Sequence, residues 1–327
     1  MRAVEYTRPL VELRSGDEPR YGGKSAALGE LLEAGIRVPP GFGLSREAYA
    51  AGRAASGDRL TVPADVRAEI AARYEQLGRS TGEPQPPVAV RSSAVGEDSA
   101  TATFAGQQDT ILWVRGLDAV CEAVSACWVS LHSDTASSYR ERFGDGREPA
   151  MGVTIQLMVD ALISGVLFTC NPLTGDPSMI AINASWGLGL SVVGGEVTPD
   201  DYLVSKVTGE LVRETLGDKR VEYVPDPDRP AVLALQTPAD RAAARCLGPP
   251  ELAALVEVAK AAQACFGSHQ DVEWAIARTG SVPDNVFIVQ SRPVTTIRTP
   301  PSADLTPSRS AISMVMAQFG AAPPGKD

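Results

Sequence analysis

Histidine is nearly absent from this chain of 327 residues, which contains only His132 and His269. The five cysteines are an odd number, and no two of them form a CxxC motif. These counts argue against a cysteine-based zinc site, and we expect the cysteines to be small core residues in a reducing compartment. A reaction that requires a histidine of this chain could use only His132 or His269.

The features of membrane, secreted and nucleic-acid-binding proteins are also missing. No apolar run is long enough to span a bilayer, and the first ten residues, MRAVEYTRPL, show no signal pattern. A net charge of −10 gives no basic footprint for nucleic acid. Hydrophobic residues make up 44% of the chain and charged residues 21%, which is ordinary for a globular protein. We expect a cytoplasmic protein whose partners include neither nucleic acid nor membrane.

The stretch from Val88 to Thr110 is the first candidate for a binding site. Two short apolar runs, 88–90 and 111–114, fit buried strands, and Arg91 follows the first of them directly. Small and hydroxyl-bearing residues fill the connection, which ends in FAGQQDT at 104–110. Small side chains let backbone N–H groups approach phosphate oxygens, and arginine offers a fork of donors. A solvated hairpin with an incidental arginine is the alternative, and the residues alone leave both open.

A second candidate begins at Gly22 and Gly23, which predict a turn. The apolar spacing that follows predicts a helix as far as Glu33. Lys24 stands where this turn enters the helix, and the N-terminus of a helix favours an anion. The segment is not a Walker A loop, because Glu18 occupies the position that needs a glycine. The alternative is a solvated lysine in a first helical turn.

The third candidate is a hairpin of strands 270–277 and 286–292, joined by the turn-forming sequence RTGSVPDN. Strand alternation places Glu273 on one face with Asp271, and Gln290 on one face with Ile288 and Arg292. If the strands pair, Glu273, Gln290 and Arg292 can converge. Carboxylate and amide oxygens are suitable ligands for Mg²⁺, with Arg292 facing the phosphates that the metal bridges. A surface hairpin with ordinary polar residues is the alternative.

Periodicity predicts the other elements. Helices are expected at 63–77, 117–131 and 251–266, with a further helix starting at 237–238. Strands are expected at 151–159, 164–169 and 179–183, the first two as partners of each other.

Taken in order, these motifs resemble one family, that of pyruvate phosphate dikinase, phosphoenolpyruvate synthase and rifampicin phosphotransferase. VRSSA followed by FAGQQDT resembles the family's ATP-binding loop, and GGKSAALGEL followed by VPPGF resembles its opening motif. GVLFT, VTPDDY, DVEWA and QSRPVT also resemble family motifs, so that the likeness covers about 22–296. One position departs from the pattern, because Leu190 stands where the family has a glutamate.

The resemblance implies an α+β (α/β) protein with an ATP-grasp-like nucleotide-binding fold of two lobes and a cleft between them. We expect the first lobe at 1–200, the second at 201–297 and a flexible tail at 298–327. The implied cofactors are ATP and Mg²⁺, with Glu273 and Gln290 as the metal ligands. The implied nucleotide contacts, of which Lys24, Arg91 and Arg292 are also the candidate catalytic residues, are Lys24, Arg91, Gly106, Thr110, Gln156, Glu273, Gln290 and Arg292.

Family members carry their phosphorylatable histidine on a separate swivelling domain, and neither histidine here lies in that motif. We therefore expect an ATP-dependent phosphotransferase that transfers a phosphoryl or pyrophosphoryl group to a histidine of a partner domain. One alternative is a stand-alone small-molecule kinase or ATP-dependent ligase in specialised metabolism or antibiotic modification. Another is a nucleotide-binding module without chemistry. Glu97 and Asp109 are candidates for a general base only through their nearness to the loop.

Overall fold

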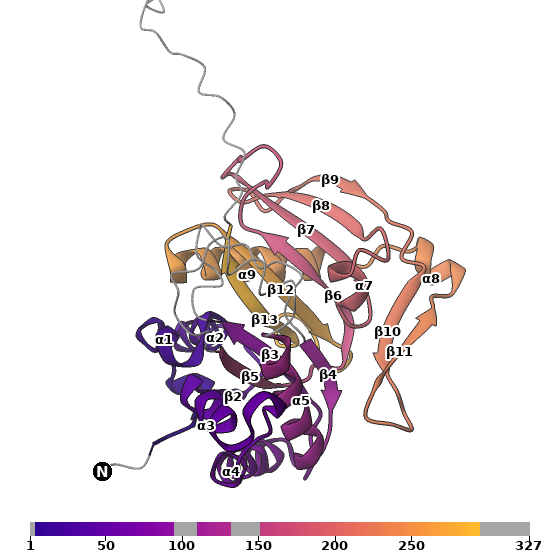
Figure 1. The fold of residues 1–327 in the computed structure, drawn as a ribbon. Helices are drawn as coiled ribbons and strands as arrows, with labels where there is room; N and C mark the ends of the chain where they lie inside the picture. Colours follow the sequence, from indigo (N-terminus) through magenta and orange to yellow (C-terminus); the bar gives the residue numbers. More distant parts are fainter. Residues whose placement is uncertain (1–3, 95–109, 132–150, 295–327) are drawn as a thin grey trace, which may run out of the picture.

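The computed structural model describes residues 4–94, 110–131 and 151–294, which form three antiparallel sheets with helices packed against the two larger ones (Figure 1). The prediction of a mixed α+β protein is confirmed. The five-stranded sheet has the order β1 (Thr7–Pro9), β2 (Gly41–Leu44), β5 (Met151–Leu157), β3 (Val88–Ala94), β4 (Thr110–Val114). The six-stranded sheet has the order β13 (Val286–Pro293), β12 (Gln270–Ala277), β6 (Ala161–Phe168), β7 (Met179–Trp186), β8 (Asp200–Ser205), β9 (Leu211–Thr215). The small sheet pairs β10 (Val221–Pro225) with β11 (Val232–Gln236).

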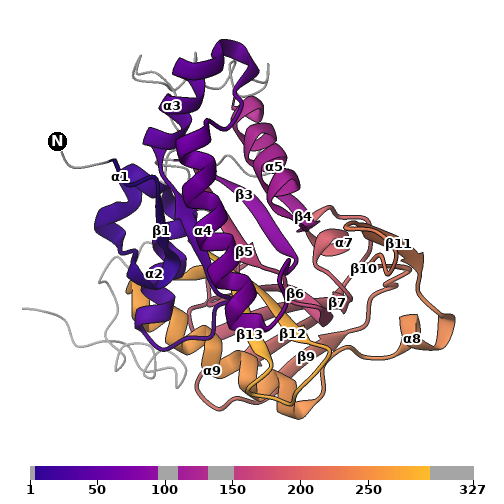
Figure 2. The ribbon, with the colours of Figure 1, turned by 90° about the horizontal axis from the view of Figure 1, so that it is seen from below.

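Three helices cover one face of the five-stranded sheet (Figure 2): α3 (Arg46–Ser56), α4 (Ala64–Thr81) and α5 (Leu117–Ser130). Val88 and Val90 of β3 belong to the core that these helices share with the sheet. Successive side chains of a strand point to opposite faces, so Ala89 and Arg91 point away from the helices. This alternation directs Arg91 toward the other large sheet.

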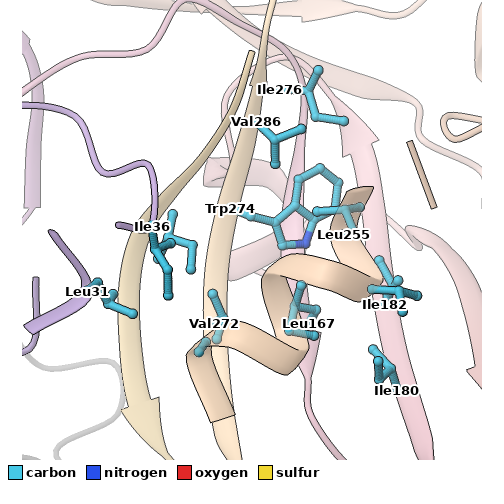
Figure 3. Close-up of a cluster of buried hydrophobic side chains, with 14 of the residues drawn as sticks. Leu31, Ile36, Leu167, Ile180, Ile182, Leu255, Val272, Trp274, Ile276 and Val286 are labelled. Carbon is cyan, nitrogen blue, oxygen red and sulfur yellow. The ribbon is translucent and has the colours of Figure 1, made fainter. Parts of the chain in front are cut away.

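The core of the six-stranded sheet also takes in the N-terminal part of the chain. Helix α9 (Pro249–Phe266) packs on β12 and β13, and Trp274 of β12 lies at the centre of the cluster (Figure 3). Leu31 of α2 (Gly23–Glu33) and Ile36 belong to the same cluster. Helix α2 therefore bridges the two sheets. None of the helices in the described ranges has the length and apolarity needed to cross a membrane.

The shorter helical segments fill the connections between these elements. They are α1 (Glu18–Tyr21), α7 (Leu190–Val193), α8 (Ala239–Ala243), η1 (Leu10–Glu12), η2 (Ser15–Asp17) and η3 (Gly57–Arg59).

The predicted pairing of the strands at 151–159 and 164–169 is wrong. Strand β5 pairs with β2 and β3, whereas β6 pairs with β12 and β7 in the other sheet. The short connection is held from both sides, because Met158 N donates to Pro87 O (2.9 Å) and Asp160 O accepts from Arg278 N (2.8 Å). Sheet membership thus changes between 157 and 161, ahead of the lobe boundary expected at 200. The division into two lobes stays a prediction.

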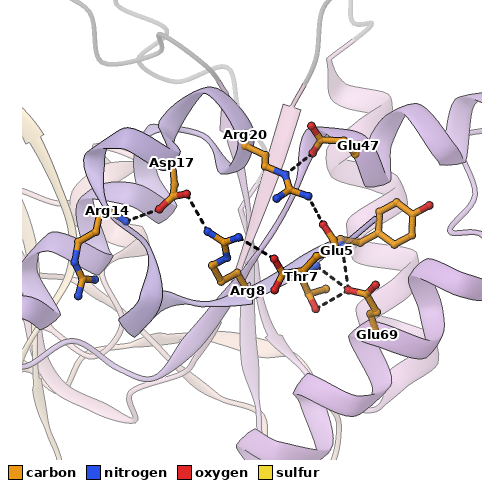
Figure 4. Close-up of polar contacts among 9 residues, drawn as sticks. Glu5, Thr7, Arg8, Arg14, Asp17, Arg20, Glu47 and Glu69 are labelled. Carbon is orange, nitrogen blue, oxygen red and sulfur yellow. Dashed lines mark hydrogen bonds and ion pairs between the residues drawn. The ribbon is translucent and has the colours of Figure 1, made fainter. Parts of the chain in front are cut away.

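A network of charged residues fixes the segment that leads into α2 (Figure 4). Arg8 donates to Glu5 (2.8 Å) and Asp17 (3.0 Å), while Arg20 donates to Glu47 (3.0 Å). The guanidinium groups of Arg8 and Arg20 each lie 5.3 Å from the ring centroid of Tyr21. Burial raises the pKa of Tyr21. These contacts place Tyr21 immediately before the first residues of α2.

Asp200, in the VTPDDY motif, organises the far side of the six-stranded sheet. Its Oδ1 pairs with the ammonium group of Lys219 and accepts from Gly217 N (2.8 Å). Its Oδ2 accepts from Cys246 N (2.8 Å) and Tyr202 OH (3.1 Å). The side chains of Asp200 and Lys219 are both 0% exposed. This carboxylate therefore holds β8 to the segments around 217 and 246.

Replacing Asp200 by Asn is expected to lower the free energy of unfolding by about 3–5 kcal/mol, because Lys219 would be left as a buried charge without its counter-charge. The neighbouring variant Asp201→Asn is the control. It breaks the exposed pair with Arg213 (2.9 Å) and should cost less than about 1 kcal/mol. Urea unfolding of both variants measures the difference, and equal losses would contradict this role of Asp200.

Candidate active site

A pocket lies between the two large sheets and encloses about 810 Å³ of space not filled by atoms, its open mouth included. Five of the predicted site residues line it: Arg91, Thr110, Gln156, Glu273 and Gln290. They come from β3, β4, β5, β12 and β13, so both sheets contribute. Most of the remaining wall is apolar.

Arg91 is the contact between the two sheets at this pocket. Its Nη1 donates to Val289 O (3.1 Å) and Gln290 Oε1 (3.2 Å), and lies 3.5 Å from Glu273 Oε2. Only 12% of the arginine side chain and 26% of the glutamate side chain are exposed. Arg91 Nε is buried and has no hydrogen-bond partner among the described residues. The guanidinium group therefore has one N–H donor, Nε, that makes no hydrogen bond to the described residues beside the pocket.

An irregularity in β13 makes this contact possible. Glu273 pairs with Gln290 and Trp274 with Ile288, so Val289 stands outside the pairing as a bulge residue. Ile288 points into the core with Trp274, and the extra residue turns Gln290 to the opposite face, beside Glu273. The prediction that Gln290 shares a face with Ile288 is therefore wrong. The prediction that Glu273 and Gln290 converge is correct.

Lys24 lies beside β3 and is 9% exposed. Its Nζ donates to Ser92 O (3.1 Å), next to Arg91 in sequence, and Ser25 N donates to Ser93 Oγ (3.4 Å). The start of α2 thus lies against the end of β3. Gly22 permits this approach with φ +82°, because a Cβ there would lie 2.0 Å from Ser93 O.

Arg292 forms an ion pair that the sequence did not predict. Its Nε and Nη2 both lie 2.8 Å from Asp271 Oδ2, the carboxylate of its cross-strand neighbour. Burial raises the pKa of Asp271, and the charge of Glu273 adds to this effect, whereas Arg292 opposes it. Asp271 and Arg292 lie two positions along the ladder from Glu273 and Gln290. Strand alternation places the two pairs on one face, as predicted, and turns the pair between them, Val272–Ser291, to the other face.

Gln156 is 2% exposed, and its amide is oriented by one hydrogen bond, from Nε2 to Pro39 O (3.3 Å). With Nε2 engaged there, Oε1 is left as an acceptor for the pocket that Gln156 lines.

The predicted residues thus fall into three groups. Arg91, Thr110, Gln156, Glu273 and Gln290 line one pocket, whereas Lys24 and Arg292 lie beside its lining. Gly106 lies outside the described residues, as do Glu97, Asp109 and His132.

Sequence reasoning missed other parts of the site. Asp271 was placed on the face of Glu273 but given no role, and its alternation with Glu273 was the available signal. Leu188, Trp274 and Val289 also line the pocket. In the sequence they resemble ordinary core residues, so no local pattern could have assigned them to the pocket.

The family described as pyruvate phosphate dikinase, AMP/ATP-binding domain, matches this chain over residues 58–309. The chain belongs to this family. A probable phosphoenolpyruvate synthase of Methanothermobacter thermautotrophicus is 38% identical, over 90% of this chain and 47% of its own length. The prodigiosin synthesizing transferase PigC of Serratia marcescens is 37% identical, over 88% of this chain and 33% of its own length.

This membership confirms the resemblance in the sequence. It also confirms the implied ATP cofactor, because the family's description names an AMP/ATP-binding domain. The chain spans less than half the length of the two curated relatives. Its own activity, acceptor and partners are therefore matters for proposal. A solved D-cycloserine synthetase, DcsG, aligns with 84% of this chain and 64% of its own at 11% identity, with a TM-score of 0.33 that is too low to support an argument.

Gly22→Ala is expected to destabilise the protein by about 3 kcal/mol or more, because strain at positive φ adds to a collision with the backbone of β3. Gly35→Ala is the matched control. Gly35 also has positive φ (+75°), but a Cβ there would meet no described atom within 4 Å. It should cost about 1–2 kcal/mol from strain alone. Thermal unfolding compares the two, and equal losses would show that α2 does not depend on this close approach.

Proposed function

We propose that the pocket binds ATP with Mg²⁺ between the lobes of an ATP-grasp-like fold, and that the chain transfers a phosphoryl or pyrophosphoryl group to a histidine of a separate partner domain. The observation that carries this proposal is the gathering of Arg91, Glu273 and Gln290. These residues come from three separate motifs, and Arg91 Nη1 reaches across from the other sheet to within 3.5 Å of both Gln290 Oε1 and Glu273 Oε2.

The pocket suits a nucleotide in its distribution of polarity. Arg91, Glu273 and Gln290 form a polar end, while Leu112, Leu157, Val159, Leu188 and Leu190 supply apolar wall for a planar base. The buried Nε of Arg91 offers a donor to a phosphate oxygen.

Gln156 favours adenine over guanine in this arrangement. Its Oε1 can accept a hydrogen bond from the exocyclic amine of adenine. Guanine presents a carbonyl oxygen at the corresponding position, and two acceptors cannot pair. Turning the amide over would sacrifice the bond to Pro39 O at a site that is almost wholly buried.

Glu273 and Gln290 fit Mg²⁺ as far as their chemistry is concerned. They offer one carboxylate and one amide oxygen from directly opposed positions on two strands. In the described part of the chain no group of three or more His, Cys, Asp or Glu side chains could hold a metal. Mg²⁺ rarely needs such a cage, because substrate phosphates and waters complete its coordination. Held by Glu273 and Gln290, the ion would neutralise negative charge on the phosphates.

The basic residues would act by position and charge. Arg91 would bind phosphate from the side of β3, with Lys24 placed beside it and Arg292 placed further along the ladder by Asp271. Phosphoryl transfer depends mainly on such positioning and charge stabilisation. A histidine acceptor attacks with the lone pair of a ring nitrogen. It needs no general base.

His269 is not suited to be that acceptor. It directly precedes β12, and its Nδ1 lies 3.3 Å from Thr169 Oγ1. Burial and the nearby charge of Lys206 lower its pKa. A residue fixed directly before a strand of the main sheet cannot travel between two active sites, which favours an acceptor on a partner domain.

A small-molecule acceptor is the second candidate. The observation in its favour is the 37% identity to a protein described as a prodigiosin synthesizing transferase. The nucleotide site would be the same in both cases, and only the nature of the acceptor would differ.

Calorimetry should show that the wild-type protein with Mg²⁺ binds ATP at least about tenfold more tightly than GTP, a difference of one hydrogen bond in free energy. Gln156→Met keeps the volume of the side chain but removes the oriented acceptor, and should bring the two affinities within about threefold. Equal affinities in the wild-type protein would contradict the role of Gln156. No binding of ATP at millimolar concentration would overturn the proposed function.

Transfer itself can be followed by phosphorus NMR with ATP and a separately produced histidine-bearing domain of a phosphoenolpyruvate synthase. Arg292→Ala should lower kcat by about 100-fold or more and change the Kd for ATP by less than about threefold, since its role strengthens as charge moves between phosphates. Arg213→Ala, an exposed arginine on β9, is the control and should keep full activity. An unchanged kcat with a raised KM in Arg292→Ala would instead assign this residue to ground-state binding.

A further inference from the structure

The guanidinium group of Arg91 contacts the same oxygen atoms that would bind a metal. Nη1 lies 3.2 Å from Gln290 Oε1 and 3.5 Å from Glu273 Oε2. These are the amide oxygen and one carboxylate oxygen of the two proposed ligands. A cation of the protein therefore already occupies the position where Mg²⁺ would bind.

Arg91 and the two ligands belong to different sheets. Glu273 and Gln290 are opposed across the β12–β13 ladder, so their spacing is set by that pairing. Arg91 reaches them from β3 of the five-stranded sheet. Its guanidinium group can move away without changing the distance between the ligands, because the β12–β13 pairing holds them. Moving away would also break the hydrogen bond from Arg91 Nη1 to Val289 O (3.1 Å).

Two cations cannot share these oxygens at low cost. A divalent ion bound to Glu273 and Gln290 would lie within a few ångströms of the guanidinium charge, in a site of restricted exposure where like charges repel strongly. Nucleotide phosphates would reduce this repulsion, because Arg91 could then pair with a phosphate instead of with Glu273 and Gln290. Its buried Nε is available as a donor to that anion.

We propose that Arg91 is the resident cation of the metal position before nucleotide binds, and that it restricts the site to metal arriving together with a nucleoside triphosphate. Free divalent metal is then excluded, and the metal–nucleotide complex is the species that the pocket selects. This role deepens the proposed function, on which it rests, by making Arg91 a determinant of specificity as well as a phosphate contact.

The test measures metal binding without nucleotide. Mn²⁺ serves as the probe, and electron paramagnetic resonance reports the free ion at low ionic strength. Arg91→Met removes the charge at similar length and should bind Mn²⁺ at least about tenfold more tightly than the wild-type protein. Arg91→Lys keeps a cation and should stay within about threefold of wild type. Adding Glu273→Gln to Arg91→Met should abolish the gain, which ties the gain to this site.

Each result decides the matter. A gain in Arg91→Met that is absent from Arg91→Lys and lost with Glu273→Gln supports the proposal. Equal Mn²⁺ affinity in wild type and Arg91→Met overturns it, as does an equal gain in Arg91→Lys, which would reflect loss of bulk rather than charge. Circular dichroism confirms that the variants are folded. ATP calorimetry on the wild-type protein is read separately, so a failure to bind ATP would overturn the proposed function and leave the metal comparison interpretable.

Discussion

The pocket depends on one extra residue in β13. Val289 stands outside the pairing with β12, and its presence moves Gln290 from the core face of the hairpin to the face of Glu273. The same bulge presents the carbonyl of Val289 to Arg91 (3.1 Å). Without it, strand alternation would direct the amide of Gln290 toward Ile288 and Trp274, where a polar group lacks partners. The bulge thus creates a polar site directly beside a buried core.

Helix α2 couples this site to the rest of the molecule. Its first turn lies against β3 through Lys24 and Ser25, while Leu31 belongs to the core of the other large sheet. Because one helix of 11 residues contacts both sheets, the orientation of Arg91 relative to Glu273 is fixed by packing as well as by its own ion pair. The ion pair alone would fix it less firmly, since holding two long side chains in one geometry costs conformational entropy.

Sequence periodicity predicted the hairpin well and the partners of the strands poorly. The bounds of β12 agree with the expected 270–277, because its alternation is regular and a turn follows it directly. The pairing of β5 with β6 was wrong because alternation identifies a strand without identifying its neighbour. The face of Gln290 was misjudged for a related reason. A bulge alters the period of two by one residue, and nothing in VFIVQSR marks where this occurs.

Leu190 bears on the net charge of the pocket lining. The sequence resemblance led us to expect a glutamate at this position, and the structure places the leucine in the pocket wall, close in sequence to Leu188 and Val193, which also line it. Among the described lining residues, Arg91 and Glu273 are the charged ones, and they pair with each other. The lining is thus close to neutral. A bare triphosphate would bring several uncompensated negative charges into it, whereas a triphosphate that carries its own divalent metal brings far fewer. A carboxylate at 190 would add a negative charge to this wall, whereas the leucine leaves the lining close to neutral.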